Sequence, residues 1–372
     1  MRISVDALAM TTPMTGVPVV IAEILRALAT HAPEVELDAY YLPPGLLGMP
    51  WGPRRTRSPS EICATTYGPP PKCPRCFSWW FKLGRIMAEQ LFFPLLLALR
   101  RTRVLLAPAY VAPLLAPCEV WLIVHDLHVY THPKTCSLLN RLHYRLLMPL
   151  SLRRAKRVFV FSRHVRDILV SRFPHVAKKV ELLPVGIPNN MGHVSNTAER
   201  EAYRLHYGLP QKFFLFVGGM HPRKNLPRLM EAMSRLPENA ALVMAGPKGA
   251  DNRAAMMAQK FKWLGYVPQN AMPCLYSMAR ALVLPSFDEG LGLPVLEAMA
   301  CHCPVLATKG PAQEFFPEAL LCDPESADSI KEGLQRLWQD DTLCHELSQH
   351  AAQRTRQLSW KNTVHILLRS QP

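Results

Sequence analysis

The sequence predicts an α/β protein made of two doubly wound, Rossmann-like domains. Short apolar runs alternate with helical patterns along nearly the whole chain, which is typical of parallel sheets with helices on both faces. The 372 residues suffice for two domains of ordinary size. A polar stretch at 187–199, rich in asparagine, glycine and proline, separates the halves. We therefore expect an N-terminal domain at 1–186, a hinge at 187–199 and a C-terminal domain at 200–357.

The first half contains six apolar runs that predict strands, with four helical patterns between them. The strands are expected at Arg2–Ala7, Val35–Tyr41, Val104–Ala107, Val120–His125, Val158–Ser162 and Val180–Pro184. The helices are expected at 17–30, 79–100, 137–155 and 163–172. Pro94 predicts a kink in the second helix. The proline-rich stretch 42–76 is expected to be a long irregular loop.

The second half repeats the alternation. Strands are expected at Phe213–Val217, Ala241–Ala245, Ala281–Leu284 and Val305–Ala307, and helices at 225–236, 270–279, 294–301, 326–339 and 341–357. The end of the chain, 358–372, is expected to form a helix that packs on the first domain. Ligands of open α/β sheets bind beyond the carboxyl ends of the strands, so we expect the site in a cleft between the two domains.

The charge of the chain is uneven. Of the net +15, residues 1–186 contribute +13, from 24 Lys and Arg against 11 Asp and Glu. Residues 139–179 alone hold eleven basic residues and one acid, Asp167. Such a field attracts polyanions or an anionic membrane surface, and a solvated basic face is an equal alternative. The aromatic residues of 79–100 (Trp79, Trp80, Phe92, Phe93) fit the core, an acceptor groove or a membrane contact.

Several classes of protein lack support in the sequence. No apolar run is long enough for a transmembrane helix, and the N-terminus lacks a signal-peptide pattern. Ten cysteines without a disulfide framework fit the cytoplasm. Cys73 and Cys76 form one CxxC without a second pair, so a surface loop is favoured over a zinc site. The sequence contains no G-x-S-x-G, H-E-x-x-H or Walker A motif.

The most informative segment is 281–301, ALVLPSFDEGLGLPVLEAMAC. An apolar strand ends in a glycine-rich loop, and Pro294 suits the first position of the following helix. Glu289 lies in the loop, and Glu297 lies about one turn into the helix. The start of a helix attracts phosphate through its amides and its dipole. A loop with amides and two carboxylates therefore suits a ligand with phosphates and hydroxyls, such as a nucleotide sugar.

A second loop follows the strand at 213–217. Gly218 and Gly219 allow phosphate to approach the backbone, and Arg223 and Lys224 supply a guanidinium fork and a point charge. Asn225 is a plausible N-cap. Because both loops follow strands of one parallel sheet, they are expected to converge on one diphosphate. Surface basic residues at a helix start are the alternative for this loop alone.

The first domain offers two weaker candidates. His125, in the tripeptide HDL, ends an apolar strand, where it could bond a sugar hydroxyl or a phosphate. Gly16 follows Thr15 just before a helix, where a helix start could meet phosphate or acceptor. A satisfied loop histidine and a simple turn are the respective alternatives.

Together these motifs resemble a known family. The glutamates of EGLGLPVLE resemble the E-x7-E signature of retaining glycosyltransferases of family 4 (glycosyl transferases group 1), which have the GT-B fold of two Rossmann-like domains facing a cleft. PRKNL, LGYVP at 264–268, TGV, HDL and FSRHVRD also look like the family, most densely over 213–325. The chain departs from it at Pro18 and Val19, where glycines and an arginine are common. It also departs at His302 and Cys303, in a turn whose backbone favours glycine.

The resemblance implies specific roles. Arg223 and Lys224 would hold the donor's diphosphate, and Glu297 would bind the ribose hydroxyls. Glu289 would lie against the transferred sugar, the amides of Gly290, Leu291, Gly292 and Leu293 would line sugar and phosphate, and His125 would contact the sugar. Gly16 and Gly218 complete the donor-binding set. The family uses a nucleotide-sugar donor and usually needs no metal or other cofactor.

The resulting prediction is transfer of a hexose, such as mannose, from a GDP- or UDP-sugar to a glycan or lipid-linked glycan in polysaccharide or lipopolysaccharide biosynthesis. The enzyme is expected in the cytoplasm, with its basic domain on the inner face of the membrane. Fixed cations and amides are expected to stabilise charge on the departing diphosphate, so a metal is dispensable. The departing phosphate can take the proton of the acceptor, so no protein base is required. A nucleotide-sugar epimerase, a catalytically inactive scaffold and a basic nucleic-acid-binding protein are the alternatives.

Overall fold

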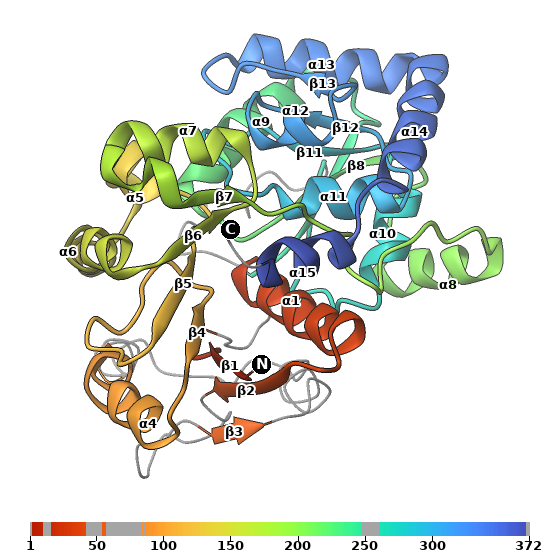
Figure 1. Ribbon diagram of the computed structural model, residues 1–372. Coiled ribbons are helices and arrows are strands. Elements are labelled where there is room, and N and C mark those ends of the chain that lie inside the picture. The colour runs from red at the N-terminus through yellow and green to blue at the C-terminus, as the bar shows by residue number, and fades with distance from the viewer. Residues whose placement is uncertain are drawn as a thin grey trace. The chain divides into compact units, whose positions relative to one another are not determined.

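The chain forms two compact α/β units. The computed structural model describes residues 2–9, 16–41, 54–56, 84, 86–247 and 260–369. The first unit comprises residues 1–186 and 360–372, and the second comprises 187–359. Figure 1 shows the elements of both units.

The first unit contains a seven-stranded sheet in the order β3-β2-β1-β4-β5-β6-β7. Only β3 runs antiparallel to its neighbour, β2. The strands are β1 (Arg2–Asp6), β2 (Glu36–Tyr41), β3 (Arg54–Thr56), β4 (Val104–Ala107), β5 (Glu119–Ile123), β6 (Arg157–Val160) and β7 (Val180–Leu182). Strands β4 and β6 are buried along their whole length, and apart from Arg157 at the start of β6 their residues are apolar, which is why both appear in the sequence as apolar runs.

Helices cover both faces of this sheet. They are α1 (Val17–His31), a π-helical turn η1 (Ala88–Phe92), α4 (Phe93–Leu99), α5 (His128–Thr131), the 3₁₀ turns η2 (Pro133–Thr135) and η3 (Pro174–Lys179), α6 (Leu138–Arg154), α7 (Arg163–Arg172) and α15 (Trp360–Leu368). Helix α15 packs against α1. On the other face, side chains of α4, α6 and α7 share one core cluster (Phe93, Leu97, Met148, Leu152, Val165, Leu169).

The C-terminal helix is fixed to the first unit by polar contacts. Buried Arg157 donates from Nη1 to the carbonyl of Leu367 at 2.7 Å and pairs with Glu181. Thr363 Oγ1 donates to the carbonyl of Pro184 at 2.5 Å. A Cβ on Gly186 would lie 2.4 Å from the Trp360 backbone nitrogen, so only glycine permits this close approach.

The second unit contains a six-stranded parallel sheet in the order β10-β9-β8-β11-β12-β13. Its strands are β8 (Phe213–Val217), β9 (Ala241–Ala245), β10 (Phe261–Gly265), β11 (Ala281–Leu284), β12 (Val305–Ala307) and β13 (Leu320–Leu321). Its helices are α8 (Thr197–Tyr207), the 3₁₀ turn η4 (Pro222–Lys224), α9 (Leu226–Ser234), α10 (Met272–Met278), α11 (Leu293–Ala300), α12 (Pro311–Phe315), α13 (Ala327–Gln339) and α14 (Asp341–Thr355).

Two further expectations can be compared with the structure. The break expected at Pro94 is present in the described part of 79–100, where the π-helical turn η1 directly precedes α4. Pro94 has no N–H to donate to Gln90, so the α-helical ladder cannot run through it. The division between the two units falls after Gly186, where the segment expected as a hinge, 187–199, begins. This segment belongs to the second unit, is hydrogen-bonded to it and enters α8 at Thr197, and its action as a hinge stays a prediction. These bonds run from Asn190 to the Gln269 carbonyl and from the Val194 amide to Ser277 Oγ.

Candidate active site

The central feature of the second unit is the point where its strand order reverses. Strands β8 and β11 are neighbours, but β8 is followed in the sheet by β9 on one side, and β11 is followed by β12 on the other. Open α/β sheets bind their ligands beyond the carboxyl ends of strands at such a point. The two loops singled out in the sequence, 218–225 and 285–292, follow these two strands.

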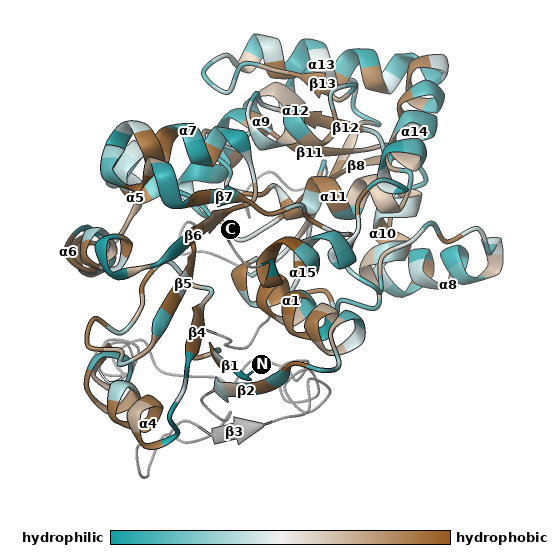
Figure 2. Cartoon of the chain, in the orientation of Figure 1, coloured by the Kyte–Doolittle hydropathy of each residue, from teal (hydrophilic) through white to brown (hydrophobic). Residues whose placement is uncertain are grey.

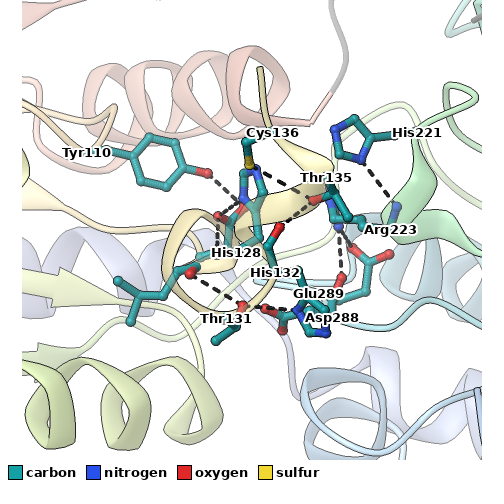
Figure 3. A network of polar contacts seen from close by, with 12 residues as sticks. Tyr110, His128, Thr131, His132, Thr135, Cys136, His221, Arg223, Asp288 and Glu289 are labelled. Atoms are coloured by element: carbon teal, nitrogen blue, oxygen red, sulfur yellow. Dashed lines mark hydrogen bonds and ion pairs between the residues drawn. The ribbon is translucent and has the colours of Figure 1, made fainter. Parts of the chain in front are cut away.

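The two loops are joined by ion pairs between two cations and one carboxylate. Lys224 Nζ lies 2.6 Å from Glu289 Oε1, and Arg223 Nη1 lies 2.9 Å from Glu289 Oε2. Arg223 Nη1 also donates to the Asp288 carbonyl at 3.0 Å. Figure 3 shows the Arg223 contacts. The structure thus brings together Arg223, Lys224 and Glu289, as the two-loop argument expected, and their combined charge is +1.

The surroundings of Glu289 keep its carboxylate ionised. Burial opposes ionisation, but the charges of Lys224 and Arg223 and hydrogen bonds from Lys224 and Ser286 outweigh it and lower the pKa to about 2. Ser286 Oγ donates to Glu289 Oε1 at 2.6 Å, and Thr308 Oγ1 donates to the Ser286 carbonyl at 2.8 Å. A carboxylate with so low a pKa is a weak base at neutral pH and suits electrostatic work better than proton transfer.

Glycines allow the loop after β8 to fold tightly. Gly218 has φ 147°, and its Cα faces the Lys224 side chain, whose Cε would lie 3.4 Å from an added Cβ. Gly246, after β9, has φ 142°, and a Cβ there would lie 2.3 Å from the Gly218 carbonyl oxygen. Both positions therefore require glycine, which fixes the path that carries Lys224 to Glu289.

Asn225 corrects one expectation. It stands at the N-cap position of α9, but its side chain accepts no capping hydrogen bond. Instead, its buried Nδ2 donates to the carbonyls of Pro285 at 3.0 Å and Pro324 at 2.7 Å, and its backbone is left-handed with φ 56°. Asn225 thus ties the β8 loop to the β11 loop.

Glu297 lies in a separate buried group. Tyr276 Oη donates to Glu297 Oε2 at 2.6 Å, and Gln269 Nε2 donates to Oε1 at 3.3 Å. Burial raises the pKa of Glu297 to about 7 in spite of these two donors. Burial also raises the pKa of Tyr276 well above its usual value, so the phenol keeps its proton and remains a donor.

The loop between the two glutamates leads directly into α11. Gly290, Leu291, Gly292 and Leu293 are all buried. Gly292 is the N-cap residue of α11, in the left-handed region with φ 67°, and its carbonyl accepts from Val295 at 2.8 Å. Pro294 lies in the first turn, as expected. Glu297 is therefore presented one turn from the start of the helix.

His125 lies in the first unit, directly after β5. It is buried, with 4% of its surface exposed, between the rings of Tyr110 and Phe161. Burial lowers its pKa, although the Pro108 carbonyl and Asp126 act in the other direction. The ring is therefore neutral at pH 7, and its Nε2 donates to the Pro108 carbonyl at 2.6 Å. In that tautomer Nδ1 is an acceptor, which suits a hydroxyl donor.

The neighbouring residues of the first unit form a polar network, also drawn in Figure 3. Asp126 accepts from Tyr110 Oη at 2.9 Å and lies 2.5 Å from His128 Nδ1. Gly16 is the N-cap of α1, with φ 58° and no side-chain cap, and Pro18 follows in the first turn. Gly16 and His125 belong to a different unit from Arg223, Lys224, Glu289 and Glu297.

Reasoning from the sequence missed the residues that orient the two glutamates. Ser286 and Thr308 support Glu289, and Tyr276 and Gln269 support Glu297. Ser286 lies inside the glycine-rich loop, so its position was a usable signal. Tyr276 lies in helix α10, 21 positions before Glu297, and nothing in the linear pattern joins them.

The other residues singled out in the sequence fall into two groups, those outside the described ranges and those whose burial or backbone the structure gives. Cys73, Cys76, Thr15, Trp79 and Trp80 lie outside the described residues. Phe93 is fully buried, whereas Phe92 is half exposed. His302 adopts the left-handed backbone expected of its turn, with φ 58°. Over the described ranges, no cluster of His, Cys, Asp and Glu is arranged to hold a metal ion, and no helix has the length and apolarity to cross a membrane.

Comparison with known proteins shows which family and which relatives the chain resembles. Residues 200–354 match the family model described as Glycosyl transferases group 1. O-antigen chain mannosyltransferase B of Escherichia coli is 29% identical over 261 residues, which cover 64% of this chain and 66% of that protein. The alignment thus spans just under two thirds of the relative's length.

Two solved structures resemble the whole chain. Sucrose-phosphate synthase from Thermosynechococcus elongatus has a TM-score of 0.74 at 19% identity, covering 99% of this chain and 97% of that one. Anabaena HepE in complex with UDP and glucose has a TM-score of 0.71 at 14% identity, covering 99% and 98%. The chain therefore has the GT-B fold, with two Rossmann-like α/β domains.

Proposed function

We propose that this protein is a retaining glycosyltransferase that transfers a hexose, such as mannose, from a GDP- or UDP-sugar to a glycan or lipid-linked glycan. The observation that carries the proposal is the group formed by Arg223, Lys224 and Glu289 where the strand order of the second unit reverses. The match of residues 200–354 to group 1 glycosyltransferases supports it. The name of the E. coli relative supports mannose, and the HepE complex makes UDP-sugars reasonable donors.

In this proposal the two cations bind the donor's diphosphate. Glu289 holds them in place without a ligand, and a diphosphate would compete with it for the same donors. As the glycosidic bond breaks, negative charge grows on the departing phosphate oxygen, and Arg223 and Lys224 stabilise it. The amides of 290–293 add dipoles near the same charge. No metal or other cofactor is required for this step.

The carboxylates and the histidine then have separate roles. Glu297 binds the ribose hydroxyls. Tyr276 orients the Glu297 carboxylate by donating a hydrogen bond to its Oε2. Glu289 lies against the transferred sugar as an anion rather than a base, because its pKa is about 2. The departing phosphate takes the proton of the acceptor hydroxyl. His125 contacts the sugar through Nδ1. Gly16 and Gly218 give the backbone the conformation that accommodates the donor or the acceptor.

The proposal is tested by turnover with and without an acceptor. A panel of GDP- and UDP-hexoses is first screened for thermal stabilisation of the protein. The best donor is then incubated with a polyprenyl-diphosphate-linked oligosaccharide, and the products are analysed by mass spectrometry and proton NMR. We expect release of nucleoside diphosphate only with acceptor, and a new linkage with the donor's anomeric configuration.

Other outcomes would overturn the proposal. Conversion of the nucleotide sugar without acceptor would indicate an epimerase. An inverted linkage would contradict the retaining assignment. Tight binding to nucleic acid without saturable binding of GDP or UDP would indicate the non-enzymatic alternative suggested by the net charge.

A further inference from the structure

Two helices of the first unit carry exposed apolar residues at every fourth position. On the helical stretch of η1 and α4, together with the N-cap residue of η1, these are Met87, Leu91, Leu95 and Leu99, and on α6 they are Leu138, Leu142, Leu146 and Leu150. Each of the eight is between 44% and 76% exposed. A spacing of four residues keeps side chains on one side of a helix. Both helices therefore present an apolar stripe to the surface in addition to the apolar side that enters the core. Figure 2 shows hydrophobic residues on both α4 and α6.

The two stripes lie on the same side of the sheet. Phe93 and Leu97 of α4 enter the same core cluster as Met148 and Leu152 of α6. Helices α1 and α15, which pack on each other, cover the opposite face of the sheet (Figure 1).

The loop 108–118, which joins β4 to β5, is hydrogen-bonded to both helices. The Ala112 carbonyl accepts from Gln90 of η1 at 3.2 Å, and the Ala112 amide donates to Ser151 of α6 at 3.1 Å. Arg154 of α6 donates to the carbonyls of Ala116 and Cys118. Leu115, in this loop, is 75% exposed. We call these nine side chains, the two stripes and Leu115, the leucine face.

Exposed arginines accompany the leucine face. On α6, Arg145 lies three residues after Leu142 and Arg153 lies three residues after Leu150, which places each arginine beside a leucine of the stripe. Arg100, Arg101 and Arg103 follow α4 and are exposed. Neither 90–118 nor 127–166 contains a single Asp or Glu. The one acid within the stripes, Glu89 of η1, is buried, so the exposed apolar residues are accompanied by cations and not by exposed acids.

From this surface we infer that the leucine face docks on a lipid bilayer that contains anionic lipids. Apolar side chains on helices bordered by arginine are the pattern of a helix that lies in the membrane interface, where leucines enter the acyl boundary and cations meet lipid phosphates. Pairing of this surface with a second copy would bring like charges together, because a two-fold interface joins a patch to itself. The inference does not rest on the proposed function.

The test is flotation of the full chain with lipid vesicles at low salt. Vesicles of phosphatidylcholine with 30% phosphatidylglycerol are compared with vesicles of phosphatidylcholine alone. We expect binding to the anionic vesicles that weakens with added salt. The variant Leu142→Gln/Leu146→Gln should lower the ratio of bound to free protein roughly tenfold or more, and Arg145→Gln/Arg153→Gln should do the same.

Matched controls come from the second unit. Leu205 is 74% exposed on α8, and Arg356 is exposed after α14, so the variant Leu205→Gln/Arg356→Gln removes the same chemistry from another surface. It should bind vesicles like the wild type, and circular dichroism should show that all variants are folded. Absence of vesicle binding, or equal loss in the control, would overturn the inference. A dimer of the wild type that the leucine substitutions dissociate, without vesicle binding, would show that the face is a self-interface.

Discussion

Two glutamates of one loop and helix respond to their surroundings in opposite ways. Burial opposes ionisation at both. At Glu289 two cations reverse the effect and lower the pKa to about 2, whereas at Glu297 only two neutral donors oppose it and the pKa rises to about 7. The same residue type thus serves as a permanent anion in one position and as a group that titrates near neutrality in the other.

The raised pKa of Glu297 has a consequence for stability. The folded state holds this proton up to about pH 7, and the unfolded chain releases it near 4.5, so the stability contributed by protonated Glu297 is lost as the pH rises through 7. We expect Glu297→Gln to stabilise the protein, by roughly 2 kcal/mol more at pH 8 than at pH 5. Urea unfolding at the two pH values measures the difference.

Glu289→Gln is the matched control and should have the opposite sign. Because the folded-state pKa of Glu289 is lowered to about 2, its ionised form contributes stability above pH 4.5 that is lost only as the pH falls toward 2. The variant should therefore be less stable than the wild type at both pH 5 and pH 8. Equal responses of the two variants would show that the environments of the two carboxylates have been misassigned.

Tyr276 provides a second prediction for the same carboxylate. Its hydrogen bond favours the ionised form of Glu297, so Tyr276→Phe should raise the pKa of Glu297 further. If the ionised carboxylate binds ribose, nucleotide affinity rises with pH, and the midpoint of that rise should move upward by about one pH unit or less. Titration of UDP or GDP from pH 6 to pH 9 measures the midpoint. An unchanged midpoint would contradict the role of Tyr276 in setting the pKa of Glu297.

The loops after β8 and β11 depend on Asn225 as their connection. Its side chain satisfies two carbonyls, and its left-handed backbone is tolerated by asparagine and glycine but not by alanine. We expect Asn225→Gly to lose about 2 kcal/mol through the two hydrogen bonds and Asn225→Ala to lose about 1 kcal/mol more through the backbone. Urea unfolding measures the free energy of unfolding of the wild type and of both variants. A glycine variant no more stable than the alanine variant would contradict this account of the bridge.

The strands that the sequence predicted most clearly are the buried ones. Strands β4 and β11 are buried and apolar throughout, and β8 is buried except at its last residue, so their apolar runs are visible in the sequence. Strand β10, FKWLG, is half-buried at the sheet edge, and β13 has only two residues, so neither has a distinct pattern. Helix α8 was missed because it buries no residue and its N-cap Asn196 resembles the polar segment before it.

The convergence of the two loops of the second unit could also be predicted from the sequence. The order of strands and loops placed Arg223, Lys224 and Glu289 at one sheet edge, and this convergence is confirmed by their contacts. Their mutual ion pairing and the support from Ser286 and Tyr276 could not be read from spacing. These contacts depend on how the helices pack on the sheet, which one sequence does not determine.

At the scale of the whole molecule, the chain ends in the unit where it began. Helix α15 buries Trp360, Val364 and Leu367, and its last carbonyls accept from Arg157. Deletion of 360–372 should destabilise the first unit by on the order of 5 kcal/mol, since three large side chains leave the core. Hydrogen exchange should show loss of protection in α1 but not in β8. Deletion of 369–372 alone is the control, and unchanged protection of α1 in the longer deletion would contradict the packing described.

The central claim is that Arg223 and Lys224 hold the diphosphate of a nucleotide ligand, and calorimetric titration with UDP and GDP tests it most directly. The wild type should bind at least one of them saturably, and Lys331→Ala, on helix α13 and outside the two loops, should bind it equally well. Arg223→Ala/Lys224→Ala should weaken binding by roughly tenfold or more, because two charge-assisted contacts are lost. Wild-type affinity in this double variant would contradict the account.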